Sequence, residues 1–424
     1  MAMLETLRNS LRLPGLRKRL LYTVAMLVVL RIGAHIPVPG VDIDRLGAIF
    51  GSGGFFDMID LFAGGAFRTF SIFAMSVTPY INSSIIMQLL TVVIPRLEEM
   101  QKEGEEGRKK IQQFTRYGTV VLGLAQAFGF GMTLKASGAF FNDSWTTLFV
   151  IMVSLTAGTA FLMWLGEEIT EKGIGNGISL IIFANIVTRL PGAIQEQLAL
   201  VPTGDRNLFQ LGLIAVVLLI MVVLVIIVTE GVRKIPVEYA KRVVGKRVYG
   251  GQRTHLPMKI NQAGVIPLIF AQSLLYFPLT IANFMPNTKF AYWVGTYLDT
   301  GSIWFMLANA ALILFFSYFY TAITFNPVDV ADNIKKNGGF IPGYRPGKPT
   351  AEYLERISTR LTLAGGIFLA AITLLPIAVI QLTGVTDAYL GGSSLLIVVS
   401  VGIETMKQIE AQLVMRHYQG FMRS

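Results

Sequence analysis

Residues 67–90, FRTFSIFAMSVTPYINSSIIMQLL, decide the fold. The stretch is long enough to cross a bilayer, because about 20 mostly apolar residues span the hydrocarbon. It also carries Asn82 and several hydroxyl side chains, and unpaired polar groups are costly in lipid. Val77, Ile81 and Ile85 stand four residues apart and predict one apolar stripe among these polar neighbours. We therefore expect this helix to line a pore rather than to face lipid.

The composition indicates a helical membrane protein with several spans. The chain has 424 residues, of which 53% are hydrophobic, and apolar runs near 20 residues recur along it. It contains no cysteine, which excludes disulfides and thiol catalysis, and its three histidines are far apart in sequence. We expect no metal site and no cofactor.

Ten transmembrane helices are predicted from the apolar runs. Their expected ranges are 19–36, 72–94, 117–134, 147–166, 177–190, 207–229, 263–283, 302–325, 359–382 and 393–412. Most of the 36 Lys and Arg residues fall in the two tails and in the loops after the even-numbered spans. The positive-inside rule then predicts a multi-pass protein with both termini in the cytoplasm.

The ten spans divide into two halves of five. An odd number of spans per half forces the second half to be inverted relative to the first. We expect an N-terminal half at 1–190, an external hinge at 191–206 and a C-terminal half at 207–424.

Two cytoplasmic loops, 230–262 and 326–358, are far longer than the usual connection of about 4 to 6 residues. The first alternates like a strand and then contains the turn signal GKR at 245–247, which predicts a β-hairpin. Long loops that carry basic side chains favour docking of an anionic partner, such as ribosomal RNA, an acidic protein surface or lipid head groups.

The sequence shows no sign of enzymatic chemistry. It contains no HExxH, nucleophile elbow, P-loop or paired intramembrane aspartates. The glycine-rich GIGNG at 173–177 lacks the lysine of a phosphate cradle, so we interpret it as a tight turn between close-packed helices. The centres of the predicted spans are nearly free of charge, and Arg31, in the outer half of the first span, is placed where it can snorkel outwards.

Five long motifs resemble the SecY family, the channel subunit of the Sec protein translocase, in its bacterial form. They are RIGAHIPVPG at 31–40, TPYINSSIIMQLL at 78–90, FLMWLGEEITEKGIGNGISLIIFANIV at 161–187, THLPMKINQAGVIPLIFA at 254–271 and FNPVDVADNIKKNGGFIPGYRPG at 325–347. The resemblance implies an all-α polytopic membrane protein. Its two inverted five-helix halves would surround an hourglass pore with a plug, and a lateral gate would lie between spans 2–3 and 7–8.

The resemblance also implies site residues. The pore ring falls on Val77, Ile81, Ile178, Ile182, Ile269 and Ile397. The plug falls on Asp57, Met58, Ile59, Asp60, Leu61, Phe62, Ala63, Gly64, Gly65, Ala66, Phe67, Arg68, Thr69 and Phe70. Partner binding falls on Lys241, Arg242, Lys246, Arg247 and Arg345.

The implied partners are the SecE and SecG subunits, the SecA ATPase motor, the ribosome, signal sequences with their unfolded preproteins, and membrane lipid, but no DNA. The implied function is passive conduction of unfolded chains outward and release of apolar segments sideways into lipid, without enzymatic activity. Two alternatives remain open at this point, a secondary transporter of small solutes and a receptor-like membrane protein without a pore. The scarcity of mid-membrane charges weighs against the transporter.

Overall fold

A computed structural model describes most of the chain. The described residues are 13–42, 45, 60, 63–136, 138–142, 144–199, 201, 208–239, 242–244, 247–249, 253–284, 288–298, 302–383 and 392–421. A helix lies over each of the ten predicted spans. In chain order the helices are α2 (Pro14–Gly33), α5 (Thr78–Val93), α6 (Pro95–Lys102), α7 (Glu105–Ala136), α8 (Trp145–Lys172), α9 (Gly177–Ala199), α10 (Leu208–Glu230), α11 (Ile266–Phe284), α12 (Lys289–Tyr297), α13 (Ile303–Thr324), α14 (Pro327–Lys336), α15 (Lys348–Thr383) and α16 (Gly392–Phe421).

Several of these helices are long and apolar enough to cross a membrane. Within the described residues six helices meet that criterion, namely α7, α8, α9, α10, α15 and the run from α13 into α14. The pair α5 and α6, bent by 100°, makes a seventh when it is taken as one span. The chain is therefore a multi-pass membrane protein, as its composition predicts.

The second predicted span, 72–94, is partly wrong. Residues 72–77 form turns and the helix α5 begins only at Thr78. Ser76 has a φ of 52°, in the left-handed region that helices exclude. Pro79 lies in the first turn of α5, where its missing N–H costs nothing, and this signal marks the true start of the helix.

Other helix ends also differ from the predicted spans. Helix α9 continues through Pro191 to Ala199, so it enters the segment 191–206 that we expect to act as a hinge. Helix α15 begins at Lys348, inside the predicted loop 326–358, and α14 lies in the same loop. The short helix α12 follows α11 and has no counterpart among the predicted spans.

The two long loops form one small folded unit. Strand β1 (Val232–Tyr239) pairs antiparallel with β4 (Arg253–Lys259) and, at Glu238 and Tyr239, with β5 (Gly339–Phe340) of the second loop. Beyond them β2 (Arg242–Val244) pairs with β3 (Arg247–Tyr249), which confirms the predicted hairpin. A separate apolar cluster lies beneath this sheet, with Ile235 from β1 and Leu354 from α15 in its centre.

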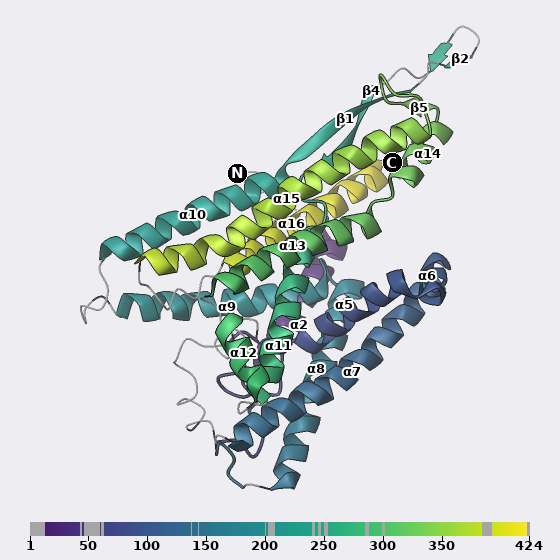
Figure 1. Cartoon of the computed structure of the whole chain (residues 1–424). Helices are drawn as coiled ribbons and strands as arrows, with labels where there is room; N and C mark the ends of the chain where they lie inside the picture. Colours follow the sequence, from purple (N-terminus) through teal and green to yellow (C-terminus); the bar gives the residue numbers. More distant parts are fainter. Residues whose placement is uncertain are drawn as a thin grey trace.

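One large apolar core joins the first five spans to the last five. Helix α11 packs against α5 and α7, and α16 packs against α9. Figure 1 shows α6, α14 and the strands on one side of the molecule and α12 on the opposite side. The loops after spans 2, 6 and 8 therefore share one side, as the charge distribution predicts.

The GIGNG segment is a tight turn, as the sequence predicts. The Asn176 side chain accepts a hydrogen bond from the Ser179 N–H and caps the start of α9. A Cβ on Gly177 would lie 1.9 Å from the Gly166 carbonyl oxygen, so only glycine permits this approach of α8 to α9.

Candidate pore and plug

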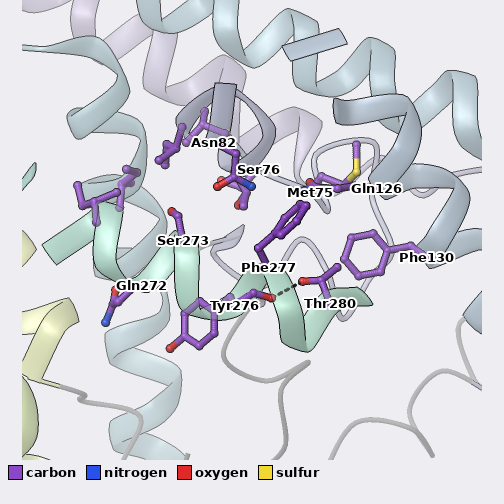
Figure 2. Close-up of a pocket in the computed structure, with 15 residues that line it drawn as sticks. Met75, Ser76, Asn82, Gln126, Phe130, Gln272, Ser273, Tyr276, Phe277 and Thr280 are labelled. Carbon is purple, nitrogen blue, oxygen red and sulfur yellow. Dashed lines mark hydrogen bonds between the residues drawn. The ribbon is translucent and has the colours of Figure 1, made fainter. Parts of the chain in front are cut away.

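A cavity of about 70 Å³ lies where α5, α7, α9 and α11 meet. Four of the six predicted ring residues, Val77, Ile81, Ile182 and Ile269, line it. Figure 2 shows the side chains around this space, with Ser273 and Phe277 of α11 facing Asn82 and Met75 from the first half. The cavity thus lies between helices of the first five predicted spans and α11 of the last five.

The ring residues share one apolar core. Val77, Ile182 and Ile397 are at most 2% exposed, while Ile81, Ile178 and Ile269 are partly buried and pack against the same cluster. Val77 is the residue before the first turn of α5, and its carbonyl accepts the Ile81 N–H at 3.0 Å. The structure therefore places all six residues in the same large apolar core, and four of them, from three parts of the chain, around one cavity.

Polar but uncharged side chains complete the wall of the cavity. Gln126 of α7 and Gln272 of α11 are at least 90% buried, and Thr280 donates to the Tyr276 carbonyl at 2.7 Å. None of the described residues that line the cavity carries a formal charge. A cavity with apolar and neutral polar walls is better suited to an occupant whose side chains vary than to an ion or a charged solute.

The plug segment is closely packed against α2 and α9. Of its predicted residues, Asp60 and the run 63–70 are described, whereas Asp57, Met58, Ile59, Leu61 and Phe62 lie outside the described residues. Gly64 has a φ of +66°, and a Cβ there would lie 2.9 Å from the Asn185 Cα. Only glycine fits at that point.

Arg31 has a role that its sequence position does not reveal. Its guanidinium donates to the Gly64 carbonyl at 3.0 Å and to the Thr188 hydroxyl at 3.3 Å. These contacts add to the predicted outward direction of Arg31 a specific role, because the side chain binds the plug segment and α9. The burial of a polar backbone turn requires such partners.

Comparisons with known proteins identify the family. The sequence model of SecY matches residues 71–406. The chain belongs to the SecY family. It is 47% identical to protein translocase subunit SecY of Bacillus subtilis, with all of both chains covered, and 46% identical to that of Escherichia coli, over 96% of this chain and 94% of the relative.

Solved structures of distant channels share the fold of this SecY family member. A structure described as that of a protein conducting channel superposes with a TM-score of 0.68 at 21% identity and covers 93% of this chain and 92% of that one. Sec61 in the canine ribosome–channel complex gives a TM-score of 0.63 at 20% identity, covering 93% and 92%. The long motifs noted in the sequence thus identified the family correctly.

The predicted docking residues are only partly described. Arg345 is exposed on the turn between β5 and α15, and its carbonyl accepts from the Thr350 hydroxyl at 2.8 Å. Arg242 and Arg247 lie on the paired strands β2 and β3, while Lys241 and Lys246 are outside the described residues. The three described residues, Arg242, Arg247 and Arg345, lie on strands and a turn formed by the two long loops.

Sequence reasoning missed most of the cavity wall. Gln126 and Phe130 stand four residues apart on α7, and Gln272, Tyr276 and Thr280 repeat at the same spacing on α11. Polar residues at helical spacing inside apolar spans are a signal of an inward-facing stripe. That signal was available in the sequence.

Proposed function

We propose that this SecY family member conducts unfolded secretory polypeptides across the cytoplasmic membrane and releases apolar segments sideways into lipid. The observation that carries this proposal is the cavity at the junction of the halves, lined by four ring residues from three parts of the chain and free of charged residues in its described wall. A hydrophobic constriction of this kind gates by excluding water and closes around the chain that fills it.

The proposed architecture has ten spans in two inverted halves, 1–190 and 207–424, joined by the hinge 191–206. Both termini lie in the cytoplasm. The overlap of a helix with each predicted span supports this architecture, as does the shared side of α6, α14 and the strands in Figure 1. The proposed lateral gate lies between α5–α7 and α11–α13, and the cavity lined in part by α5, α7 and α11 supports this position.

The proposed mechanism is passive. A hydrophobic signal sequence binds at the lateral gate, because each buried CH₂ group contributes about 0.8 kcal/mol. This binding favours the open arrangement, the plug leaves the vestibule, and the chain passes through the ring of Val77, Ile81, Ile178, Ile182, Ile269 and Ile397. Segments of about 20 apolar residues partition into lipid instead.

The proposed energy source is a partner that docks on the cytoplasmic unit. Arg345 and the hairpin β2–β3 are placed to bind an acidic protein surface or ribosomal RNA, so we assign them to SecA and to the ribosome. Two distant channels of the same fold were solved in complexes with a ribosome, which supports this assignment. SecE and SecG are the proposed membrane partners.

A proteoliposome assay tests the function. Vesicles that contain the chain with its accessory subunits should import a secretory preprotein when the motor and ATP are added. Uptake of a small solute with no preprotein import would support the transporter alternative, which neither family membership nor the uncharged cavity favours.

A further inference from the structure

Asp60, in the plug segment, is a fully buried carboxylate with partners of two kinds. Its side chain is 0% exposed. It accepts hydrogen bonds from the N–H groups of Phe67 at 3.0 Å and Arg68 at 3.1 Å, and the Arg68 guanidinium lies 3.4 Å away. These partners belong to the plug segment itself, so they would travel with Asp60 in any displacement of the segment.

Arg189 is the partner from outside the plug. Its guanidinium forms an ion pair with the second carboxylate oxygen of Asp60, and its own side chain is 13% exposed. The residue lies on α9, 129 positions along the chain from Asp60. This contact therefore links the plug to a wall of the channel.

Arg189 also lies on the face of α9 that carries the ring. Ile178, Ile182, Asn185 and Arg189 stand at intervals of four, three and four residues, which places them in one row along the helix. In this row the ring residues come first, then the residue that contacts Gly64, then the residue that pairs with Asp60. One helix thus carries two of the predicted ring residues and two residues that contact the plug segment.

We propose that the Asp60–Arg189 ion pair is a latch that holds the plug closed against α9. The inference deepens the proposed channel function and rests on it. Displacement of the plug separates the two charges while the Asp60–Arg68 contacts stay intact. Separation takes the Arg189 cation away from a fully buried carboxylate, and breaking one contact of a buried ion pair costs free energy. The pair thus favours the closed arrangement until a bound signal sequence offsets its loss.

The test uses five variants of the chain, one of them the charge-conserving Arg189→Lys, in proteoliposomes with its accessory subunits. Arg189→Gln and Asp60→Asn each remove one charge. Asp60→Asn combined with Arg189→Gln replaces the pair by neutral amides and leaves neither residue charged. Arg68→Gln is the matched control, because it removes a cation from the same carboxylate without changing the link to α9.

Two readouts are measured, the ion permeability of idle channels and the import of a preprotein whose signal sequence is defective. We expect both readouts to rise at least about tenfold in Arg189→Gln, in Asp60→Asn and in the double variant. A loss of about 1.4 kcal/mol in the free energy that favours the closed over the open arrangement already changes their ratio tenfold. The control should stay within about twofold of the original chain, while Arg189→Lys, which keeps the positive charge but not the guanidinium geometry, should leak less than Arg189→Gln.

Three results would overturn the latch. The first is a double variant, Asp60→Asn with Arg189→Gln, whose ion permeability equals that of the original chain. The second is an Arg68→Gln variant with the ion permeability of Arg189→Gln. The third is an Arg189→Lys variant with that same permeability. The double variant decides the matter when a single-charge variant is not recovered from the membrane. Import of a normal preprotein by the original chain is measured in parallel. Absence of this import would refute the channel function itself. Normal import together with variants whose ion permeability does not rise would refute only the latch.

Discussion

The Asn185 side chain donates a hydrogen bond to the Ser76 hydroxyl at 3.3 Å, and both residues are 2% exposed. The contact joins the middle of α9 to the left-handed turn that precedes α5. The backbone of Asn185 also sets the limit on what can stand at position 64 of the plug. One residue of α9 therefore contacts both the plug segment and the turn that precedes α5.

Replacing Gly64 should loosen the plug. In Gly64→Ala the new Cβ would lie 2.9 Å from the Asn185 Cα, which is closer than a carbon atom tolerates, so the plug segment must move away from α9. We expect higher ion permeability of idle channels, measured as dye-reported ion flux in proteoliposomes.

Gly65→Ala is the control for that variant. Gly65 has a φ of +88°, and a Cβ there meets no atom within 4 Å. Both substitutions carry the left-handed strain of about 1–2 kcal/mol, so only the contact with Asn185 separates them. Equal permeability in the two variants would contradict the close packing of plug and α9.

The ring should lose its seal when a polar side chain enters it. Ile81→Asn places an amide at the cavity, where it stabilises water in the constriction. We expect this variant to import preproteins with defective signal sequences and to leak ions. The measurement is import of paired normal and defective preproteins.

Ile81→Leu controls for the change of shape at the same position. It keeps the volume and the apolar character, and such exchanges usually cost less than about 1.5 kcal/mol. An Ile81→Asn variant that still rejects defective signals and leaks no ions would show that the ring is not the seal.

The cytoplasmic unit should depend on its small apolar cluster. Leu354 is 0% exposed at the centre of that cluster, and Leu→Ala at such a site costs about 2–5 kcal/mol. We expect Leu354→Ala to unfold the unit formed by β1, β4, β5 and α14 while the membrane helices stay intact. Hydrogen exchange of β1 and β4 should accelerate, and unchanged exchange would refute the prediction.

The exposed Arg345 should matter for docking rather than for folding. Arg345→Glu leaves the apolar cluster intact, so we expect normal hydrogen exchange in β1 and β4. Reversal of the charge should weaken binding of an acidic partner surface. Stimulation of the motor's ATPase by the reconstituted channel should fall several-fold in low salt, and full stimulation would remove Arg345 from the docking surface.

The sequence was sufficient for features that depend on local pattern. The length of the apolar runs located the helices, and the alternation of apolar and polar residues located the hairpin that contains β1 and β4. The glycines of 173–177 indicated the turn before α9. The long motifs identified the family. These signals lie within short windows, where periodicity and turn chemistry act.

Contacts between distant segments could not be predicted from pattern. Nothing in the windows around Asp60 and Arg189 shows that they meet, and the pairing of β1 with β5 joins two loops that looked independent. The start of α5 was misplaced because apolarity continues through 72–77, although Pro79 marked the boundary. Long-range charge pairs and strained turns are set by tertiary packing.

The most direct test of protein conduction places a photo-crosslinking residue at Ile81. Membranes would hold a secretory protein arrested halfway across, and the same probe at Leu219, which is 65% exposed on α10, would serve as the control. We predict a crosslink from position 81 to the mature part of the arrested chain and none from position 219. Absence of the crosslink at 81, with the arrested chain confirmed in the membrane, would contradict conduction through the ring.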